Sequence, residues 1–148
     1  MVTIRKLQKE DAKDIEGLER KSFSSPWPLE EIEYELTDNP CSVLLGLFEG
    51  NGLCGYIDFM ITFDSATINR ICVLETKRKK GYATLLLKEM EKICKEQEEP
   101  VEWITLEVRE GNIAAQSLYR KMGYMDVTVK KMYYEDGENA IYMMRSLL

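Results

Sequence analysis

Apolar and polar residues follow two different periods along this chain, which predicts both strands and helices. Alternating or nearly continuous apolar runs predict strands at residues 2–7, 42–48, 53–63, 67–74, 103–109, 124–134 and 140–147. Apolar residues at a helical spacing predict helices at residues 12–22, 29–36, 83–97 and 113–122. Strands and helices are interleaved through the whole length, so the pattern predicts a single α/β domain over residues 1–148.

Turn and capping residues separate several of these elements. Asn51-Gly52 lies between two predicted strands and is a strong signal for a hairpin. Asp11 and Asn112 precede predicted helices and are expected to cap their N-termini. Gly123 follows the last helix, where a glycine commonly closes the C-terminus. That helix carries an apolar stripe that we expect to face the sheet, formed by Ala114, Leu118 and Met122.

Composition narrows the class of protein. Apolar residues make up 45% of the 148 residues and charged residues 31%, which is typical of a globular domain. We expect a cytoplasmic protein, because no apolar run is long enough to span a bilayer and the N-terminus lacks a signal-peptide core. The net charge of −6 argues against nucleic-acid binding and is compatible with a cationic substrate, such as an amine or a basic peptide. Oligomeric state stays open, and a monomer is compatible with the sequence.

The cysteines and the missing histidine restrict the chemistry further. The four cysteines are scattered, with no Cys-x-x-Cys pair, and the chain has no histidine, so we expect no metal site. The absence of histidine also excludes a Ser-His or Cys-His nucleophile. Any proton transfer must fall to Glu, Asp, Tyr, Lys or Cys.

A basic turn with one glycine lies between the strand that ends near Leu74 and the helix that follows. Four cationic residues, 77–80, precede Gly81 there, although the chain as a whole is acidic. The free N–H groups of a new helix attract anions, and glycine tolerates unusual backbone conformations. Three interpretations remain open on the turn alone: a Walker-type phosphate loop, whose spacing is absent, a solvated basic loop, or a pyrophosphate site for coenzyme A.

The turn resembles a known family. Residues 78–83, Arg-Lys-Lys-Gly-Tyr-Ala, match the Gln/Arg-x-x-Gly-x-Gly/Ala signature of the GCN5-related N-acetyltransferases, the GNAT superfamily. Residues 106–124 resemble the RimI branch, which acetylates the N-terminal alanine of a bacterial ribosomal protein, and the related catalytic subunits of NatA type. Residues 25–27 and 131–140 resemble that branch's Pro-Trp element and Tyr-Tyr hairpin. The similarity covers nearly the whole chain in matching order, and it implies the mixed, helix-flanked sheet of the GNAT fold.

The resemblance also implies a role for particular residues. Glu107 would be the general base for the incoming amine, and Tyr119 the general acid for the departing thiolate. The acetyl-CoA cofactor would contact Ile71, Cys72, Val73, Arg78, Lys79, Lys80, Gly81, Tyr82, Ala83, Thr84, Asn112 and Tyr119. The protein or peptide N-terminus would lie among Pro26, Trp27, Glu107, Tyr133 and Tyr134.

The chemistry suits these residue types. An α-amino group has a pKa near 8, so about one in ten is neutral at pH 7, and a carboxylate suffices as its base. Each residue also has a plain structural interpretation: Glu107 could pair with Arg109, Tyr119 could be a core residue, and Tyr133 could be an ordinary strand residue. Cys72 beside the expected thioester site raises the alternative of an acyl-cysteine mechanism, whereas the family implies direct transfer.

Three functions therefore compete. The first is an acetyl-CoA-dependent N-terminal acetyltransferase of RimI type, with a ribosomal protein as a candidate substrate. The second is a GNAT enzyme that acetylates a small amine, and the third is a non-catalytic module that binds coenzyme A.

Overall fold

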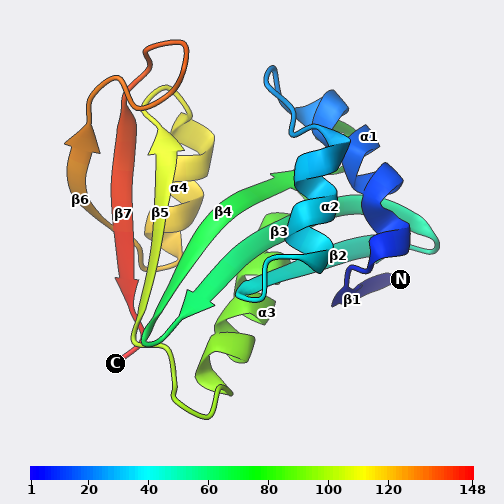
Figure 1. The fold of residues 1–148 in the computed structure, drawn as a ribbon. Coiled ribbons are helices and arrows are strands. Elements are labelled where there is room, and N and C mark those ends of the chain that lie inside the picture. The colour runs from blue at the N-terminus through cyan, green and yellow to red at the C-terminus, as the bar shows by residue number, and fades with distance from the viewer.

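The computed structural model describes all residues 1–148 as one seven-stranded sheet with helices on both faces (Figure 1). The strands are β1 (Val2–Lys6), β2 (Ser42–Glu49), β3 (Gly52–Thr62), β4 (Ser65–Val73), β5 (Trp103–Arg109), β6 (Met125–Lys130) and β7 (Ala140–Ser146). The α-helices are α1 (Ala12–Ser22), α2 (Leu29–Thr37), α3 (Tyr82–Lys95) and α4 (Ile113–Lys121), with short 3-10 turns η1 (Lys9–Asp11) and η2 (Glu75–Lys77). The predicted element order is confirmed.

The sheet divides in the middle. Its strand order is β1-β2-β3-β4-β5-β7-β6, and only β4 and β5 run parallel. These two strands pair only from Ser65↔Trp103 to Thr67↔Thr105. Beyond that point β4 curves away from β5, as Figure 1 shows, and the two backbones no longer pair; we call this divergence the opening. This opening separates a β1–β4 half from a β5–β7–β6 half, and it positions the candidate site.

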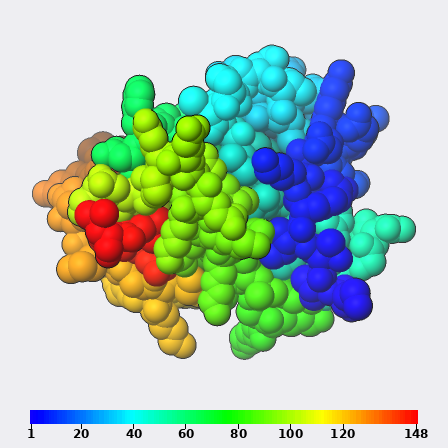
Figure 2. Space-filling model, turned by 90° about the horizontal axis from the view of Figure 1, so that it is seen from below, coloured from blue at the N-terminus to red at the C-terminus, as the bar shows by residue number.

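Two apolar clusters lie on opposite faces of the sheet. The larger one packs α3 and α4 against the sheet and includes the fully buried Phe59, Leu86 and Leu106. The smaller one lies beneath α1 and α2 and includes Ile15 and Ile32. In Figure 2 the N-terminal segment (blue) and the C-terminal residues (red) lie at opposite sides of the lower surface. No helix combines the length and the apolar character needed to cross a membrane.

One strand end and one turn differ clearly from the sequence-based prediction. The strand predicted over residues 124–134 ends at Lys130, and residues 131–139 form a loop. Met132 has a positive φ of 53°, and its N–H binds the side-chain oxygen of Asn139 at 3.0 Å, so the chain leaves the sheet before Tyr133. The β2–β3 turn consists of Gly50 and residue 51 rather than Asn51-Gly52, because Gly52 already pairs with Glu49 and Gly50 takes the positive φ of 59°.

Of the three residues predicted to end or cap helices, Asn112 and Gly123 act as predicted and Asp11 does not. Asn112 caps α4, since its side-chain oxygen accepts the Ala115 N–H at 3.2 Å. Gly123 ends the helix with φ of 97°, as predicted. Asp11 does not cap α1, so that prediction was wrong: its carboxylate accepts the Gln8 N–H at 2.7 Å and binds the Arg5 guanidinium at 2.9 and 3.0 Å.

Candidate active site

A hollow of about 460 Å³ lies between the turn that joins β4 to α3 and one side of α4. The predicted cofactor residues that line it are Val73, Arg78, Lys79, Gly81, Tyr82, Ala83 and Thr84. Ala114, Ser117, Leu118 and Lys121 of α4 form its other wall. The stripe prediction was wrong for Ala114, which is exposed and lines the hollow instead of facing the sheet.

The turn is shaped to receive an anion. Gly81 precedes α3 with φ of 78°, a conformation that residues with a Cβ rarely adopt. Residues 82–84 then form the first turn of the helix, whose N–H groups have no partner within the helix, and all three line the hollow. A Cβ at Gly81 would meet nothing within 4 Å, so the backbone angle explains the glycine.

Glu49, at the end of β2, organises the cations of this turn. Its carboxylate binds Lys77 at 2.6 Å and Lys80 at 3.4 Å, and it accepts the Tyr82 hydroxyl hydrogen bond. The bond from Lys77 and that from Tyr82 lower the pKa of Glu49 to about 2, and the Glu49 contact raises the pKa of Tyr82 to about 12. Lys80 therefore faces Glu49, whereas Lys79 lines the hollow with no carboxylate partner.

Neighbouring residues of β4 point to different sides of the sheet. Val73 joins the larger cluster and lines the hollow, and Ile71 packs against the same cluster. Cys72 belongs to the smaller cluster beneath α1, and burial raises the pKa of its thiol to about 12. A buried, protonated thiol is a poor nucleophile, so the geometry argues against an acyl-cysteine mechanism.

Glu107 lies on β5, on the sheet face opposite to the larger cluster, and only 18% of its side chain is exposed. Its carboxylate accepts a hydrogen bond of 2.7 Å from Lys130. The ammonium of Lys130 also lies 4.6 Å from the centre of the Tyr142 ring and 5.4 Å from that of Tyr133. Glu107 does not pair with Arg109, the structural alternative considered from sequence, and the role of Lys130 was not predicted.

Tyr119 is buried in α4, and its ring centre is 5.7 Å from that of Tyr124. Burial and the nearby Tyr134 raise the pKa of Tyr119, so its hydroxyl is a neutral donor. Burial also raises the pKa of Tyr134 to about 12, with contributions from charges that include Glu107. Tyr134 thus contributes to the raised pKa of Tyr119, and Glu107 to that of Tyr134, whereas Tyr119 packs in the larger cluster and Glu107 lies on the opposite face of the sheet.

The loop of residues 131–139 is joined to β5 by ion pairs. Arg109 of β5 binds Asp136 at 2.9 Å and Glu138 at 2.8 Å, and its guanidinium lies 4.1 Å from the centre of the Tyr134 ring. Tyr133 packs edge-on against Tyr134 and remains 49% exposed. Both predicted tyrosines therefore lie in an ordered loop beside the opening, although outside the strand in which they were expected.

The loop between α1 and α2 carries Pro26 and Trp27. Pro26 is exposed, and the half-buried Trp27 donates its backbone N–H to Glu19 of α1 at 2.8 Å. Arg70 of β4 lies 5.0 Å from the centre of the Trp27 ring. Sequence reasoning missed both Glu19 and Arg70.

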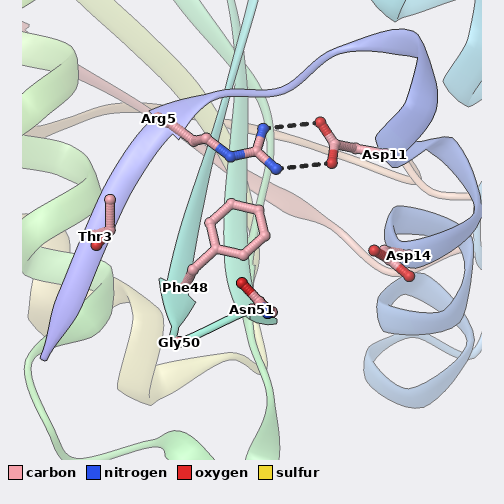
Figure 3. Close-up of a pocket in the computed structure, with 7 residues that line it drawn as sticks. All are labelled: Thr3, Arg5, Asp11, Asp14, Phe48, Gly50 and Asn51. Atoms are coloured by element: carbon pink, nitrogen blue, oxygen red, sulfur yellow. Dashed lines mark hydrogen bonds and ion pairs between the residues drawn. The ribbon is translucent and has the colours of Figure 1, made fainter.

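A second hollow, of about 270 Å³, lies between β1, the start of α1 and the β2–β3 turn (Figure 3). Arg5 and Asp11 form a two-bond ion pair in it, and the Arg5 guanidinium lies 4.4 Å from the centre of the Phe48 ring. The charges of Arg5 and Asp11 neutralise each other, and none of the predicted site residues lines this hollow.

Comparison with known families agrees with this geometry. Residues 12–124 match the model described as "Acetyltransferase (GNAT) family". The chain belongs to the GNAT acetyltransferase family.

Individual GNAT relatives are similar over almost the whole chain. A "Putative [ribosomal protein bS18]-alanine N-acetyltransferase" of Bacillus subtilis is 33% identical over 141 residues, covering 95% of this chain and 92% of the relative. An "N-alpha-acetyltransferase" of Saccharolobus solfataricus is 31% identical, covering 98% and 93%. The crystal structure of the ribosomal-protein-S18-alanine N-acetyltransferase from Escherichia coli superposes with a TM-score of 0.87 at 26% identity, covering 99% and 94%.

GNAT acetyltransferases use acetyl-CoA, and the hollow beside α3 suits that cofactor. A pyrophosphate requires donors and positive charge, which the first turn of α3, Arg78 and Lys79 supply. An elongated acyl arm requires an open strand edge, which β4 offers where it leaves β5. The residues present therefore fit the cofactor that the family implies.

Proposed function

We propose that this GNAT enzyme transfers the acetyl group of acetyl-CoA to the N-terminal α-amino group of a protein, with the N-terminal alanine of a ribosomal protein as its natural target. The observation that carries the proposal is the hollow between the β4–α3 turn and α4, beside the point where β4 leaves β5, because its free helix N–H groups and cations suit acetyl-CoA. The relatives named above act, by their names, on a ribosomal-protein alanine or on α-amino groups, which supports this acceptor over a small amine.

The cofactor would be held from two sides. Residues 82–84 and the cations Arg78 and Lys79 would bind its pyrophosphate, and Val73 with α4 would enclose its arm. The side-chain amide N–H₂ of Asn112 makes no hydrogen bond within the chain while its oxygen caps α4, so it is free to donate to the same arm. Acetyl-CoA supplies an acetyl group activated as a thioester.

Glu107 would act as the general base. Its carboxylate is largely buried and fixed by Lys130, so it is positioned to take a proton from an arriving α-amino group. The amine then attacks directly, because Cys72, the cysteine expected beside the thioester, is buried with its thiol protonated. No acyl-enzyme step is needed.

Tyr119 would act as the general acid. Its pKa is raised, so the hydroxyl keeps its proton at neutral pH and can donate it to the departing sulfur. A thiolate that is protonated as it leaves cannot easily reverse the transfer. Because Tyr119 comes from α4 and Glu107 from β5, the two groups reach the reaction from different elements.

The peptide would enter between two loops. Pro26 and Trp27 lie in the loop that precedes α2, and Tyr133 and Tyr134 in the loop that follows β6. Both loops are tied to the sheet through an arginine, Arg70 in one and Arg109 in the other. Such a frame suits an extended N-terminus better than a compact small amine.

The test is acetyl transfer from acetyl-CoA to short peptides that begin with Ala, Ser, Met or Glu. Each peptide is paired with an N-terminally blocked copy that contains lysine. Acetylation of free N-termini alone, with a preference for one first residue, is the expected result. Activity on blocked lysine peptides or on free polyamines alone would overturn the proposal.

A further inference from the structure

We infer that Glu19 and Arg70 are positioning residues that fix Trp27, and that the rigid Trp27 restricts the substrate to small first residues; this rests on the function proposed above. Neither residue touches the cofactor hollow. They act through the α1–α2 loop, whose Trp27 would form one wall around the peptide's first residue.

Glu19 is the centre of this arrangement. It lies on α1 with its side chain completely buried, and a buried carboxylate is tolerated only when it is well paired. It accepts hydrogen bonds from the Trp27 N–H at 2.8 Å and from the Tyr56 hydroxyl at 2.5 Å. Arg70 adds two more, at 3.0 Å from Nε and 2.8 Å from Nη2.

Arg70 connects the same loop to the sheet. Its guanidinium also donates to the Ser25 carbonyl at 3.0 Å. The guanidinium carbon lies 3.8 Å from the centre of the Phe23 ring and 5.0 Å from that of Trp27. Stacking on aromatic faces while forming a two-bond ion pair requires the planar fork of arginine, which lysine lacks.

Trp27 also packs against the smaller apolar cluster, but the loop has few hydrogen bonds. Between the end of α1 and the start of α2, residues 24–27 make no backbone–backbone hydrogen bond, and Pro26 and Pro28 cannot donate one. Their hydrogen bonds to the rest of the chain are the Trp27 N–H to Glu19 and the Ser25 carbonyl from Arg70. Glu19 and Arg70 therefore supply the hydrogen bonds that hold the backbone on which the indole is carried.

The register explains why the position matters for the reaction. Arg70 follows a bulge in β4 and directly precedes residues 71–73, which border the opening beside β5. The residue that fixes the peptide-facing loop is thus rigidly joined to the strand expected to hold the thioester. A wall fixed in this way cannot move back to admit a larger first side chain.

The primary variant is Arg70→Lys, which keeps the charge beside Glu19 but loses the second hydrogen bond and the stacking. We expect KM for an alanine peptide to rise about tenfold, and the preference for alanine over methionine in kcat/KM to fall about tenfold. KM for acetyl-CoA should stay within about twofold, because the hollow is unaffected.

The matched control is Arg145→Lys. Arg145 pairs with Glu91 at 2.7 Å and is 23% exposed, close to the 20% of Arg70, but it lies between β7 and α3, away from the loop. If Arg70→Lys behaves like Arg145→Lys in peptide KM and in first-residue preference, the inference is wrong.

A second measurement does not depend on turnover. In a Trp103→Phe background Trp27 is the sole tryptophan, and acrylamide quenching of its fluorescence should increase at least about twofold on Arg70→Lys. Unchanged quenching would overturn the inference even where the variant has lost activity. If the unsubstituted enzyme acetylates no peptide, the proposed function fails, while the quenching result still decides whether the pair holds Trp27.

Discussion

Lys130 and Glu107 form a hydrogen bond of 2.7 Å that spans one strand, because β7 lies between β6 and β5. Tyr142 of β7 is directly opposite Glu107, and its ring lies 4.6 Å beneath the Lys130 ammonium. The contact with Glu107 raises the pKa of Lys130, so the lysine remains charged. The proposed base therefore faces a permanent cation at the place where an amine must arrive uncharged.

Replacing Lys130 with methionine should make the enzyme require a higher pH. A nearby ammonium disfavours a second positive charge and lowers the pKa of the bound α-amino group, so its removal raises that pKa by about half to one unit. The profile of kcat against pH, measured with one N-terminal peptide at saturation, should move upward by the same amount. Lys131→Met is the control, since Lys131 is exposed and does not contact Glu107. Superimposable profiles for Lys130→Met and the unsubstituted enzyme would contradict this account.

Replacing Tyr119 with phenylalanine should lower kcat by about a hundredfold or more, with little change in either KM. The hydroxyl would act only when the thiolate leaves, so its loss removes an interaction of the transition state. Tyr124→Phe is the matched control, because Tyr124 is buried beside Tyr119 and packs against its ring. A Tyr119→Phe enzyme that keeps kcat within about threefold would assign the protonation to another group.

Cys72→Ala should retain activity within about threefold, because direct transfer requires no thiol. Iodoacetamide should label the partly exposed Cys41 before the buried Cys72, whose raised pKa keeps the thiol protonated. Labelling is followed by mass spectrometry alongside activity. Loss of activity that tracks modification of Cys72, or an acetyl group recovered on it, would restore the acyl-cysteine mechanism.

The sequence predicts the element order and the ends of α4 because those features depend on local pattern. Asn112 and Gly123 act on backbone groups a few residues away, so spacing alone identifies them. Asp11 has the same local signature as a cap, yet Arg5 of β1 and the N–H of Gln8 engage its carboxylate. Which partner the Asp11 carboxylate binds depends on the position of β1, and a local sequence pattern does not predict that position.

The parts of the site that periodicity cannot predict are contacts across the sheet. A helical stripe containing Ala114 is equally compatible with facing the sheet or a cofactor hollow. Which of the two it faces depends on the opening between β4 and β5. Glu19 and Arg70 are 51 residues apart, and they meet because a bulge in β4 changes which side chains share a face. Met132 ends β6 through a positive φ that its sequence does not indicate.

Asp58 offers a prediction about stability. Its side chain is completely buried on β3, and neither oxygen has a donor at hydrogen-bond distance, although the nearby Asn69 side chain favours the ionised form; its carboxyl group faces that of Glu35 on α2. Two carboxyl groups can bond only when one holds a proton, and Asp58 holds it: burial, and then Glu35, raise the pKa of Asp58 to about 9. Hydrogen bonds from Asp58, Asn39 and Ser42 outweigh desolvation and lower the pKa of Glu35, so Glu35 is the acceptor.

The folded chain thus binds one proton that the unfolded chain, with an aspartate pKa near 4, has released by neutral pH. The stability that this proton provides is fully present below about pH 4 and is lost as pH rises toward 9. The free energy of unfolding should therefore fall by about 2 to 3 kcal/mol between pH 6 and pH 8. Asp58→Asn carries a permanent donor toward Glu35 and should lose most of this pH dependence of stability. Urea unfolding at pH 6 and at pH 8 measures the free energy of unfolding of each protein.

Asp126→Asn is the control. Arg120 lowers the pKa of Asp126, so Asp126 is ionised at both pH values and its replacement should leave the pH dependence of stability unchanged. Equal slopes for Asp58→Asn and the unsubstituted enzyme would contradict this assignment. They would mean that Asp58 is already ionised at pH 6 and that another group causes the pH dependence of stability.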